Sequence, residues 1–282
     1  MKKILITGAN SYIGVSFERY IKENFSGEYT VDTLDMLYDD WRGTSFADYD
    51  CVYHVAGIAH QKETAQNCRS YYEVNRNLAV EVACKAKSDG ARQFIFLSTM
   101  SVYGMHSGVV TRETVPSPKS HYGASKLQAE QGITPLEDSG FKVCILRPPM
   151  VYGKGCKGNF NSLCKLVKKL PFFPWVKNRR SMIYIDNLSS FVRMCIDKEL
   201  SGVYFPQNRE YVSTVDMAKA IASAMGKKIR FEYLSGLAVC ILRLFYPAAK
   251  KGFGSLIYLD TEEFDFCYVV KNNKQSYIDS VS

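Results

Sequence analysis

The sequence predicts an α/β protein in which a doubly wound parallel sheet is followed by a smaller C-terminal substrate-binding region. Three observations support this prediction. Short apolar runs, typical of strands buried on both faces of a sheet, alternate with amphipathic helical patterns. The first apolar run leads into a glycine turn that opens a helix. After Tyr152 the chain changes to a Gly- and Lys-rich segment, 153–158, and then to shorter elements.

Strands are predicted at residues 3–7, 29–34, 51–55, 94–98 and 142–146, and helices at 15–24, 71–88 and 122–131. Strands that alternate with helices imply parallel pairing through right-handed crossovers, which is the arrangement of a Rossmann domain. In the second region, a basic helix is expected at 161–170. A further helix is expected at 214–225, because a Ser/Thr start and Gly226 delimit it.

The composition is that of an ordinary globular protein, with 282 residues, 46% hydrophobic and 23% charged. Nine cysteines without a Cys-x-x-Cys pair indicate reduced thiols and a cytoplasmic location, and the four histidines lack metal-ligand spacing. No signal-peptide pattern opens the chain, and its longest later apolar stretch, 234–246, is too short to span a bilayer. The net charge of +8 favours an anionic partner, but nucleic acid, acidic lipid and phosphorylated metabolites all qualify.

The first glycine turn, from Gly8 to Gly14, predicts a dinucleotide site. Backbone N–H groups of such a turn approach a pyrophosphate, and the positive end of the next helix favours its charge. Asp35 ends the second predicted strand, 21 positions after Gly14 (35 − 14). A carboxylate there binds the ribose hydroxyls of NAD and repels the 2′-phosphate of NADP. NAD is therefore the expected cofactor, and a purely structural turn is the alternative.

Tyr122 and Lys126 lie at i and i+4, on one face of a predicted helix. An ammonium there is expected to lower the pKa of the phenol toward neutrality. Such a phenolate can take a proton from a sugar hydroxyl while hydride leaves the same carbon for a nicotinamide. A chance Tyr-x-x-x-Lys spacing is the alternative.

These motifs, in this order, resemble the extended short-chain dehydrogenase/reductases that act on nucleotide sugars, the NAD-dependent epimerase/dehydratase type. The resemblance is carried by TGANSYIG at 7–14, HVAG at 54–57, FLSTMSVYG at 96–104, YGASK at 122–126, RPPMVYG at 147–153 and RRSMIYIDNL at 179–188. Ser11 stands where the family fingerprint has its middle glycine. We expect some backbone strain there.

The resemblance implies catalytic roles for Tyr122, Lys126 and Thr99, with Thr99 hydrogen-bonding the reacting oxygen of the substrate. Arg180 would grip the nucleotide diphosphate through its planar guanidinium, and Asn159 would contact the sugar or diphosphate. The expected cofactor-binding residues are Gly8, Asn10, Ser11, Tyr12, Ile13, Gly14, Asp35, Asp40, Trp41, Val55, Ala56, Gly57, Asn75, Ser98, Tyr122, Lys126 and Pro148.

Met100 and Ser101 follow Thr99. Nucleotide-sugar 4,6-dehydratases of the family carry an Asp-Glu pair there, because water elimination needs a further acid and base. Dehydration and decarboxylation are therefore disfavoured, which leaves redox chemistry at a carbinol carbon. The expected activity is 4-epimerisation of a UDP-hexose or UDP-N-acetylhexosamine. An NAD(P)H-dependent 4-keto-sugar reductase of a polysaccharide precursor pathway is the alternative, and a non-catalytic NAD-binding regulator is the third hypothesis.

Residues 1–155, with 183–205 returning to them, are expected to bind NAD, and 156–182 with 206–282 to bind the UDP-sugar. Only residues 36–51 separate Asp35 from Val52, so an open adenine pocket built from Asp40 and Trp41 is expected. By resemblance, helices near 75–87 and 122–131 would form a homodimer interface. Neither a nucleic-acid partner nor a membrane span is expected.

Overall fold

The computed structural model describes residues 1–38, 40–59, 61–233, 235, 238–239, 253–259 and 264–281, without the side chain of Asn159. The chain forms two compact units. The first comprises Met1–Gly104, Val115–Pro148 and Leu188–Pro206, and the second comprises Met105–Thr114, Pro149–Asn187 and Gln207–Ser282. The assignment of NAD to one region and of the sugar to the other stays a prediction.

A six-stranded parallel sheet forms the first unit, in the order β10-β6-β4-β3-β1-β2. Its strands are β1 (Lys2–Thr7), β2 (Tyr29–Leu34), β3 (Cys51–His54), β4 (Gln93–Leu97), β6 (Lys142–Leu146) and β10 (Gly202–Tyr204). The strand order reverses between β1 and β3, where doubly wound sheets bind ligands beyond the carboxyl ends of their strands. The predicted fold class is confirmed, as are the five predicted strands.

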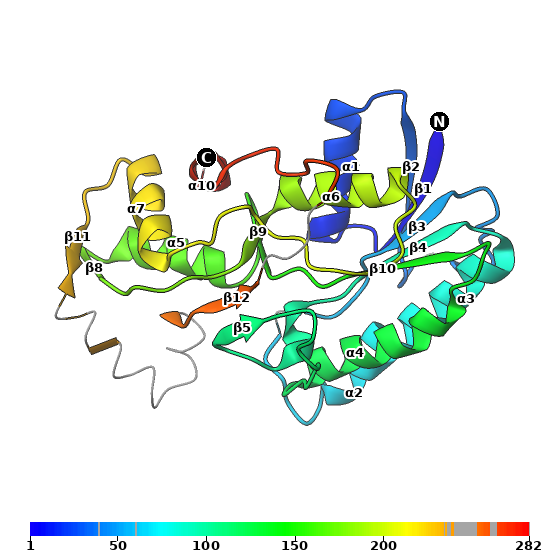
Figure 1. The fold of residues 1–282 in the computed structure, drawn as a ribbon, viewed down its shortest axis with the longest axis horizontal. Coiled ribbons are helices and arrows are strands. Elements are labelled where there is room, and N and C mark those ends of the chain that lie inside the picture. Colours follow the sequence, from blue (N-terminus) through cyan, green and yellow to red (C-terminus); the bar gives the residue numbers. More distant parts are fainter. Residues whose placement is uncertain are drawn as a thin grey trace. The chain divides into compact units, whose positions relative to one another are not determined.

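Helices cover both faces of this sheet (Figure 1). α1 (Tyr12–Asn24) and α6 (Ile185–Asp197), which enters the first unit at Leu188, lie on one face. α3 (Ala79–Asp89) and α4 (His121–Ile133) lie on the other. The sheet residues Leu5, Val52 and Phe94 share a core with Ala83 of α3 and Ala129 of α4. Helices bury both faces of the sheet. Because its strands are parallel, the residues that follow their carboxyl ends all lie along one edge.

The helix predicted at 71–88 is present but is not one regular helix. It consists of α2 (Cys68–Tyr71), a π-helix η1 (Tyr72–Leu78) and α3. Two 3₁₀ turns, η2 (Met100–Tyr103) and η3 (Thr134–Leu136), also belong to this unit. π-Helical turns are rare and often occur at functional sites. This one contains the buried Asn75.

Three pairs of short parallel strands form the second unit: β5 (Gly108–Val110) with β12 (Leu256–Tyr258), β7 (Met150–Tyr152) with β9 (Met182–Tyr184), and β8 (Phe172–Pro174) with β11 (Arg230–Glu232). Its helices include α5 (Asn159–Lys169), α7 (Thr214–Ala224) and α10 (Asn273–Val281). The delimiters predicted for α7 are present, because Ser213 caps its N-terminus and Gly226 follows at φ 64°.

The described part of the chain has no helix that is both long and apolar enough to cross a bilayer. Among the same residues, no three His, Cys, Asp or Glu side chains gather as metal ligands would. The eight described cysteines are free thiols. Cys240 lies outside the described residues.

Candidate active site

The glycine turn and Asp35 leave the sheet side by side. Thr7, the last residue of β1, pairs with Leu34, the last residue of β2. The N–H groups of Gly8 and Ala9 both donate to the carbonyl of Leu34, at 2.9 and 3.1 Å. Asp35 therefore follows directly beside the turn, and its Oδ1 accepts the Leu37 N–H at 2.9 Å. The carboxylate stays partly exposed.

The turn needs glycine at position 8 for two reasons. Gly8 has φ +114°, and a Cβ there would lie 2.7 Å from the backbone nitrogen of Ala56. The other left-handed residue is Asn10, at φ 64°, and asparagine tolerates this region better than most residues. Ser11 has φ −71° and ψ 144°, and its Oγ accepts the Gly14 N–H at 3.1 Å as the helix cap. The expected strain at Ser11 is therefore wrong, since the left-handed conformation falls one residue earlier.

These residues fit a dinucleotide. α1 begins with Tyr12 and Ile13 and carries no acidic side chain in its first turn, so no carboxylate of that turn offsets its positive end. Because Gly8 has no side chain, the turn packs directly against the backbone of Ala56. A pyrophosphate at this turn and a ribose on Asp35 match the two chemical groups.

The loop after β3 borders the same edge of the sheet. The N–H groups of Val55 and Ala56 both donate to the Thr7 carbonyl, at 3.0 and 2.9 Å. A Cβ at Gly57 would lie 2.9 Å from the Asn75 Oδ1 and 3.2 Å from the Lys126 Nζ. Glycine is thus the residue that lets this loop approach both side chains.

Asn75 connects the loop to α4. It is fully buried. Its Oδ1 accepts the Ile58 N–H at 2.7 Å, and its Nδ2 donates to the Ile58 carbonyl at 3.1 Å and to the Ser125 Oγ at 3.3 Å. The π-helix supplies the local geometry that places this amide between the loop and the helix.

Tyr122, Thr99 and Lys126 come together at the carboxyl end of β4. Thr99 follows β4, its Oγ1 donates to the Ser101 Oγ at 3.2 Å, and its hydroxyl lies close enough to the Tyr122 phenol to affect the pKa of that group. Tyr122 is partly exposed, whereas Lys126 is buried one turn further along α4. The Lys126 Nζ donates to the Leu97 carbonyl at 2.9 Å and lies 4.6 Å from the centre of the Phe96 ring. The arrangement offers one accessible phenol above one buried ammonium.

The electrostatics differ from the sequence-based expectation. Burial raises the pKa of Tyr122, and the nearby Thr99 hydroxyl opposes that rise. Lys126 is not among the causes of this shift, and its ammonium donates to the Leu97 carbonyl. Burial also lowers the pKa of Lys126 to about 8, against a smaller opposite effect of Glu130. The pKa of Tyr122 is thus raised in this structure, opposite to the predicted lowering toward neutrality, and the catalytic role of Lys126 stays a prediction.

Glu130 of the same helix forms a buried ion pair with Arg147, which follows β6; the sequence analysis did not identify this pair. Glu130 is 3% exposed, and both of its oxygens accept from the Arg147 Nε at 3.1 Å. Ser98 donates to the same carboxylate, and the Arg147 Nη1 donates to the Tyr103 hydroxyl at 2.7 Å. The sequence did contain a signal for Glu130, because Tyr122, Lys126 and Glu130 are spaced four residues apart and therefore lie on one helix face.

Glu63 is a second residue that the sequence analysis missed. Its Oε1 accepts the Tyr122 N–H at 2.9 Å and its Oε2 accepts the His121 N–H at 3.1 Å. Ser120 adds the usual side-chain cap by accepting the Gly123 N–H at 3.1 Å. Glu63 lies in a distant loop segment, so no local sequence pattern could have paired it with α4.

Two residues that were predicted to bind the cofactor, Trp41 and Asp40, make contacts within the protein. Trp41 is 4% exposed and belongs to the core cluster that also contains Leu34 and Phe46. Asp40 is exposed, and its Oδ1 accepts the Gly43 N–H at 3.2 Å. The expectation that Trp41 lines an open adenine pocket is therefore corrected. Its ring packs into the core, because the short 36–51 segment needs an apolar anchor. The carbonyl of Pro148 accepts the Met100 N–H at 2.9 Å, which fixes the chain after Thr99.

The predicted substrate residues belong to the second unit. Arg180 is partly buried, and its Nη1 donates to the Gly254 carbonyl at 3.0 Å. Burial lowers its pKa. Asn159 is the first residue of α5, and its side chain lies outside the described part of the structure. The roles of both residues stay predictions.

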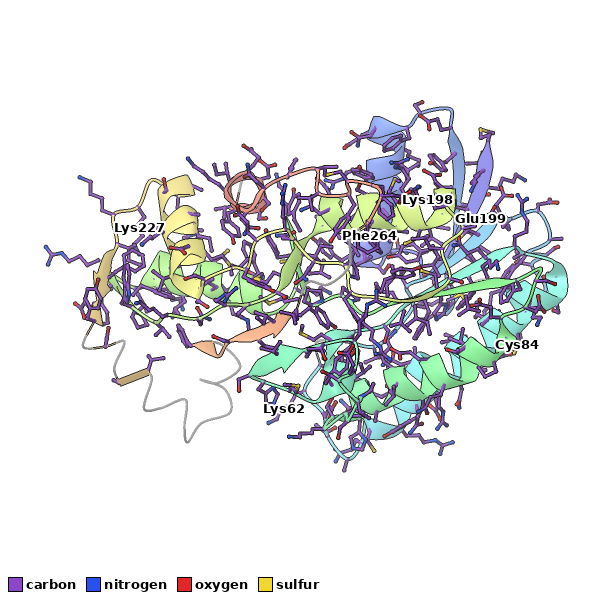
Figure 2. All side chains as sticks on the ribbon, in the orientation of Figure 1. Lys62, Cys84, Lys198, Glu199, Lys227 and Phe264 are labelled. Carbon is purple, nitrogen blue, oxygen red and sulfur yellow. The ribbon has the colours of Figure 1, made fainter. Side chains whose placement is uncertain are left out.

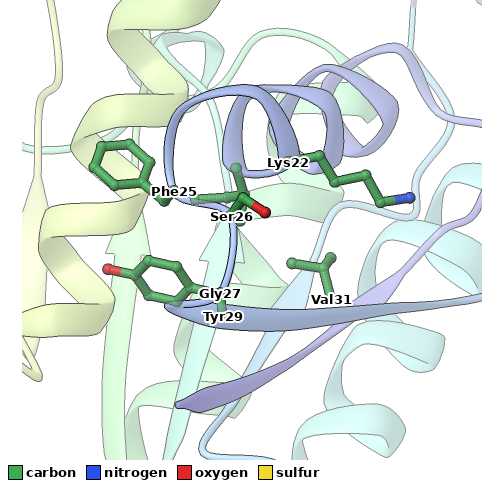
Figure 3. A pocket seen from close by; sticks show the side chains of 7 residues that line it. Lys22, Phe25, Ser26, Gly27, Tyr29 and Val31 are labelled. Atoms are coloured by element: carbon green, nitrogen blue, oxygen red, sulfur yellow. The ribbon is translucent and has the colours of Figure 1, made fainter.

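A hollow at the opposite edge of the sheet is a less suitable candidate for a ligand site than the surroundings of Tyr122 (Figure 3). It lies where α1 ends and β2 begins, whereas Asp35 follows the other end of β2. Its volume of about 230 Å³ is below that of typical ligand pockets. It is lined by Ile21, Lys22, Phe25, Ser26, Gly27, Tyr29 and Val31. These side chains carry none of the chemistry gathered around Tyr122.

Comparison with known families agrees with this site. The sequence model of the NAD dependent epimerase/dehydratase family matches residues 4–205. The chain belongs to this family. The predictions of a nucleotide-sugar enzyme and of NAD as its cofactor are thereby confirmed.

Individual relatives point the same way. The UDP-glucose 4-epimerase of Vibrio cholerae is 31% identical over 253 residues, which cover 80% of this chain and 76% of that protein. The UDP-2-acetamido-2,6-beta-L-arabino-hexul-4-ose reductase of Pseudomonas aeruginosa is 24% identical over 71% of this chain and 51% of its own length. The crystal structure of the UDP-glucuronic acid 4-epimerase of Bacillus cereus with NAD has a TM-score of 0.73 at 20% identity, covering 99% and 96% of the two chains. At that identity the structural likeness concerns the fold.

Proposed function

We propose that this protein is an NAD-dependent 4-epimerase of a UDP-hexose or UDP-N-acetylhexosamine. The observation that carries the proposal is the partly exposed Tyr122, which lies near Thr99 and one helical turn from the buried Lys126. This group lies at the carboxyl end of β4, on the same sheet edge as the glycine turn. The similarity to the Vibrio cholerae enzyme supports the UDP-sugar assignment.

Bound NAD supplies an acceptor, and then a donor, of hydride. Gly8 and the first turn of α1 hold its pyrophosphate in this proposal, and Asp35 holds a ribose. Tyr122 takes the proton of the C4 hydroxyl and later returns it, while Thr99 binds the same oxygen. Burial opposes the phenolate form of Tyr122, so the reaction needs the positive charge of Lys126 nearby. Lys126 is thus a source of charge and Tyr122 the group that moves the proton.

Substrate recognition is assigned to the second unit. Arg180 would bind the diphosphate by paired hydrogen bonds, and Asn159 would contact the sugar or the diphosphate. Met100 and Ser101 lack the acid and base that dehydration requires. The product in this proposal is therefore an epimer and not an unsaturated or deoxygenated sugar.

The decisive experiment asks whether the cofactor is retained. The purified protein is denatured and released NAD is measured; the native protein is then incubated with UDP-glucose or UDP-N-acetylglucosamine without added cofactor. We expect bound NAD and interconversion of the 4-epimers. Tyr122→Phe should lower the rate about 10²- to 10⁴-fold, whereas the control Tyr72→Phe, which removes only a hydrogen bond to His121, should not. Absence of any turnover, together with unchanged cellular activity of Tyr122→Phe, would favour a non-catalytic NAD-binding regulator.

A 4-keto-sugar reductase is the second candidate, because a reductase of a 4-keto UDP-sugar is among the relatives. That enzyme would consume NAD(P)H in stoichiometric amounts with a 4-keto sugar. It would release the oxidised cofactor, so denaturation would yield little NAD. The same two measurements therefore separate the candidates.

The proposal includes a homodimer formed through α3 and α4, and a cytoplasmic enzyme that supplies polysaccharide precursors. Sedimentation of the purified protein tests the first statement. Fractionation of cells that produce it tests the second.

A further inference from the structure

One end of the second unit carries a cationic surface, which we call the α5–β11 surface. It comprises exposed cations from the last turns of α5 and from the chain entering and forming β11: Lys165, Lys168, Lys169, Lys228 and Arg230. On α5, Lys165, Lys168 and Lys169 are spaced i, i+3 and i+4, which places them on one helix face. Residues 139–185 contain no Asp or Glu.

A single side chain fixes the two parts of this surface together. The Nζ of Lys227 donates to the carbonyls of Val167, Lys168 and Leu170, at 2.8, 2.7 and 2.8 Å. These carbonyls end α5, where a cation is favourable. Lys227 lies between α7 and β11 (Figure 2). The bonds thus hold Lys228 and its neighbours beside the last turn of α5.

These cations are not balanced by carboxylates. Within the described residues, none of the five forms an ion pair. In contrast, many cations of the first unit form ion pairs, including Lys22 with Glu18 and Arg42 with Glu81. Glu232 is the acidic side chain of β11. An ordinary solvated surface mixes both signs, so this end of the unit is suited to an anionic partner.

Exposed apolar side chains belong to the same elements as these cations or directly adjoin them. Phe172 pairs with Arg230 in the parallel register of β8 and β11, and 39% of Phe172 is exposed. Leu166 is 36% and Tyr233 69% exposed. In the sequence, Tyr233 precedes the apolar stretch 234–246, which lies largely outside the described residues. A basic surface with interspersed aliphatic and aromatic side chains fits the interface of an anionic bilayer.

We propose that the α5–β11 surface docks the enzyme on a membrane rich in anionic phospholipid. The cations bind the lipid head groups, while Leu166, Phe172 and Tyr233 enter the interfacial region. Nothing in this contact requires a spanning helix. The docking is independent of the proposed activity, since it uses none of the residues assigned to NAD or to the sugar.

The test is co-sedimentation of the full-length protein with vesicles of phosphatidylcholine alone or with phosphatidylglycerol at a 7:3 ratio, a probe composition. We expect binding to the anionic vesicles that weakens as salt rises. The variant Lys168→Glu/Lys169→Glu should bind at least about 25-fold more weakly, since the loss of each cation near the surface costs about fivefold and the two added carboxylates are repelled by the anionic lipid. Its rate with UDP-sugar in solution should equal that of the parent, which reports that the fold is intact.

The matched control is Lys198→Glu/Lys274→Glu, which changes the net charge equally at exposed positions outside the surface. It should bind as the parent does. Equal loss in both variants would overturn the proposal in favour of a bulk charge effect. Failure to bind anionic vesicles at low salt would also overturn it. So would tighter binding to a single-stranded oligonucleotide than to vesicles at the same salt.

Discussion

The carboxylate of Glu63 accepts the backbone N–H of Tyr122 at 2.9 Å, across 59 positions of sequence. The same carboxylate accepts the N–H of His121. α4 therefore begins on an anionic side chain from the loop after β3, which is where the positive end of a helix is best stabilised. The position of the Tyr122 side chain depends on this contact, because it belongs to the first turn of the helix.

Glu63→Gln should destabilise the protein by about 1 kcal/mol, the usual effect of a lost N-terminal cap. The amide keeps one acceptor oxygen but presents an N–H₂ group to the second backbone donor. Urea unfolding measures the stability, and turnover should fall more than substrate affinity because the displaced group is Tyr122. Glu73→Gln, which breaks an exposed pair with Arg69, is the control and should cost less than 0.5 kcal/mol. Equal effects of both changes would contradict the positioning role.

The lowered pKa of Lys126 predicts that the free energy of unfolding rises with pH. Its pKa is about 8 in the folded protein against 10.5 for the free side chain. Between these values the unfolded chain binds more protons, so the free energy of unfolding increases with pH. From pH 7.5 to 9.5 the parent should gain about 2 kcal/mol relative to Lys126→Met, measured by urea unfolding. The exposed control Lys119→Met should track the parent at both pH values. A constant gap between the parent and Lys126→Met would show that folding does not lower the pKa of Lys126.

The Arg147 and Glu130 pair should show strong coupling. Arg147→Met leaves a carboxylate in the core without its cation, so a loss of about 3 kcal/mol or more is expected. The double variant Glu130→Leu/Arg147→Met removes both charges and should recover most of that loss. Thermal unfolding of the single and double variants provides the cycle. Additive losses would mean that the two side chains do not interact energetically.

Gly8→Ala should weaken both folding and NAD retention. Alanine at φ +114° is strained, and its Cβ would meet the Ala56 nitrogen at 2.7 Å. Gly27→Ala is the matched control, since Gly27 has φ +88° but nothing within 4 Å of the added atom. We expect a loss of about 1 kcal/mol for the control and clearly more for Gly8→Ala, with at least tenfold less NAD recovered after denaturation. Equal stability losses would mean that the backbone angle alone matters.

The strands were predictable because each buried run has its own local signal. The predicted strands 29–34 and 142–146 match β2 and β6 in both bounds. The break of the 71–88 helix into a π-helical centre was not predictable, because it depends on contacts of Asn75 with the remote Ile58 and Ser125.

In the candidate site, too, features with a local sequence signal were predictable and features that depend on remote contacts were not. Tyr122, Lys126 and Thr99 are recognisable from spacing and from motif order, and the structure brings them together. The raised pKa of Tyr122 could not be predicted from the sequence, because it depends on how deeply the fold buries the phenol. The cap by Glu63 has no local pattern at all.

The π-helix has a consequence for length variation in this chain. A π turn accommodates one residue more than an α turn, so deleting a single residue within Tyr72–Leu78 would let the backbone relax into a continuous α-helix. One residue corresponds to about 100° of rotation around the axis. The amide of Asn75 would then swing away from Ile58. A homologue with a one-residue gap at this point should therefore have lost the anchor of the loop beside Lys126, even where every catalytic side chain is retained.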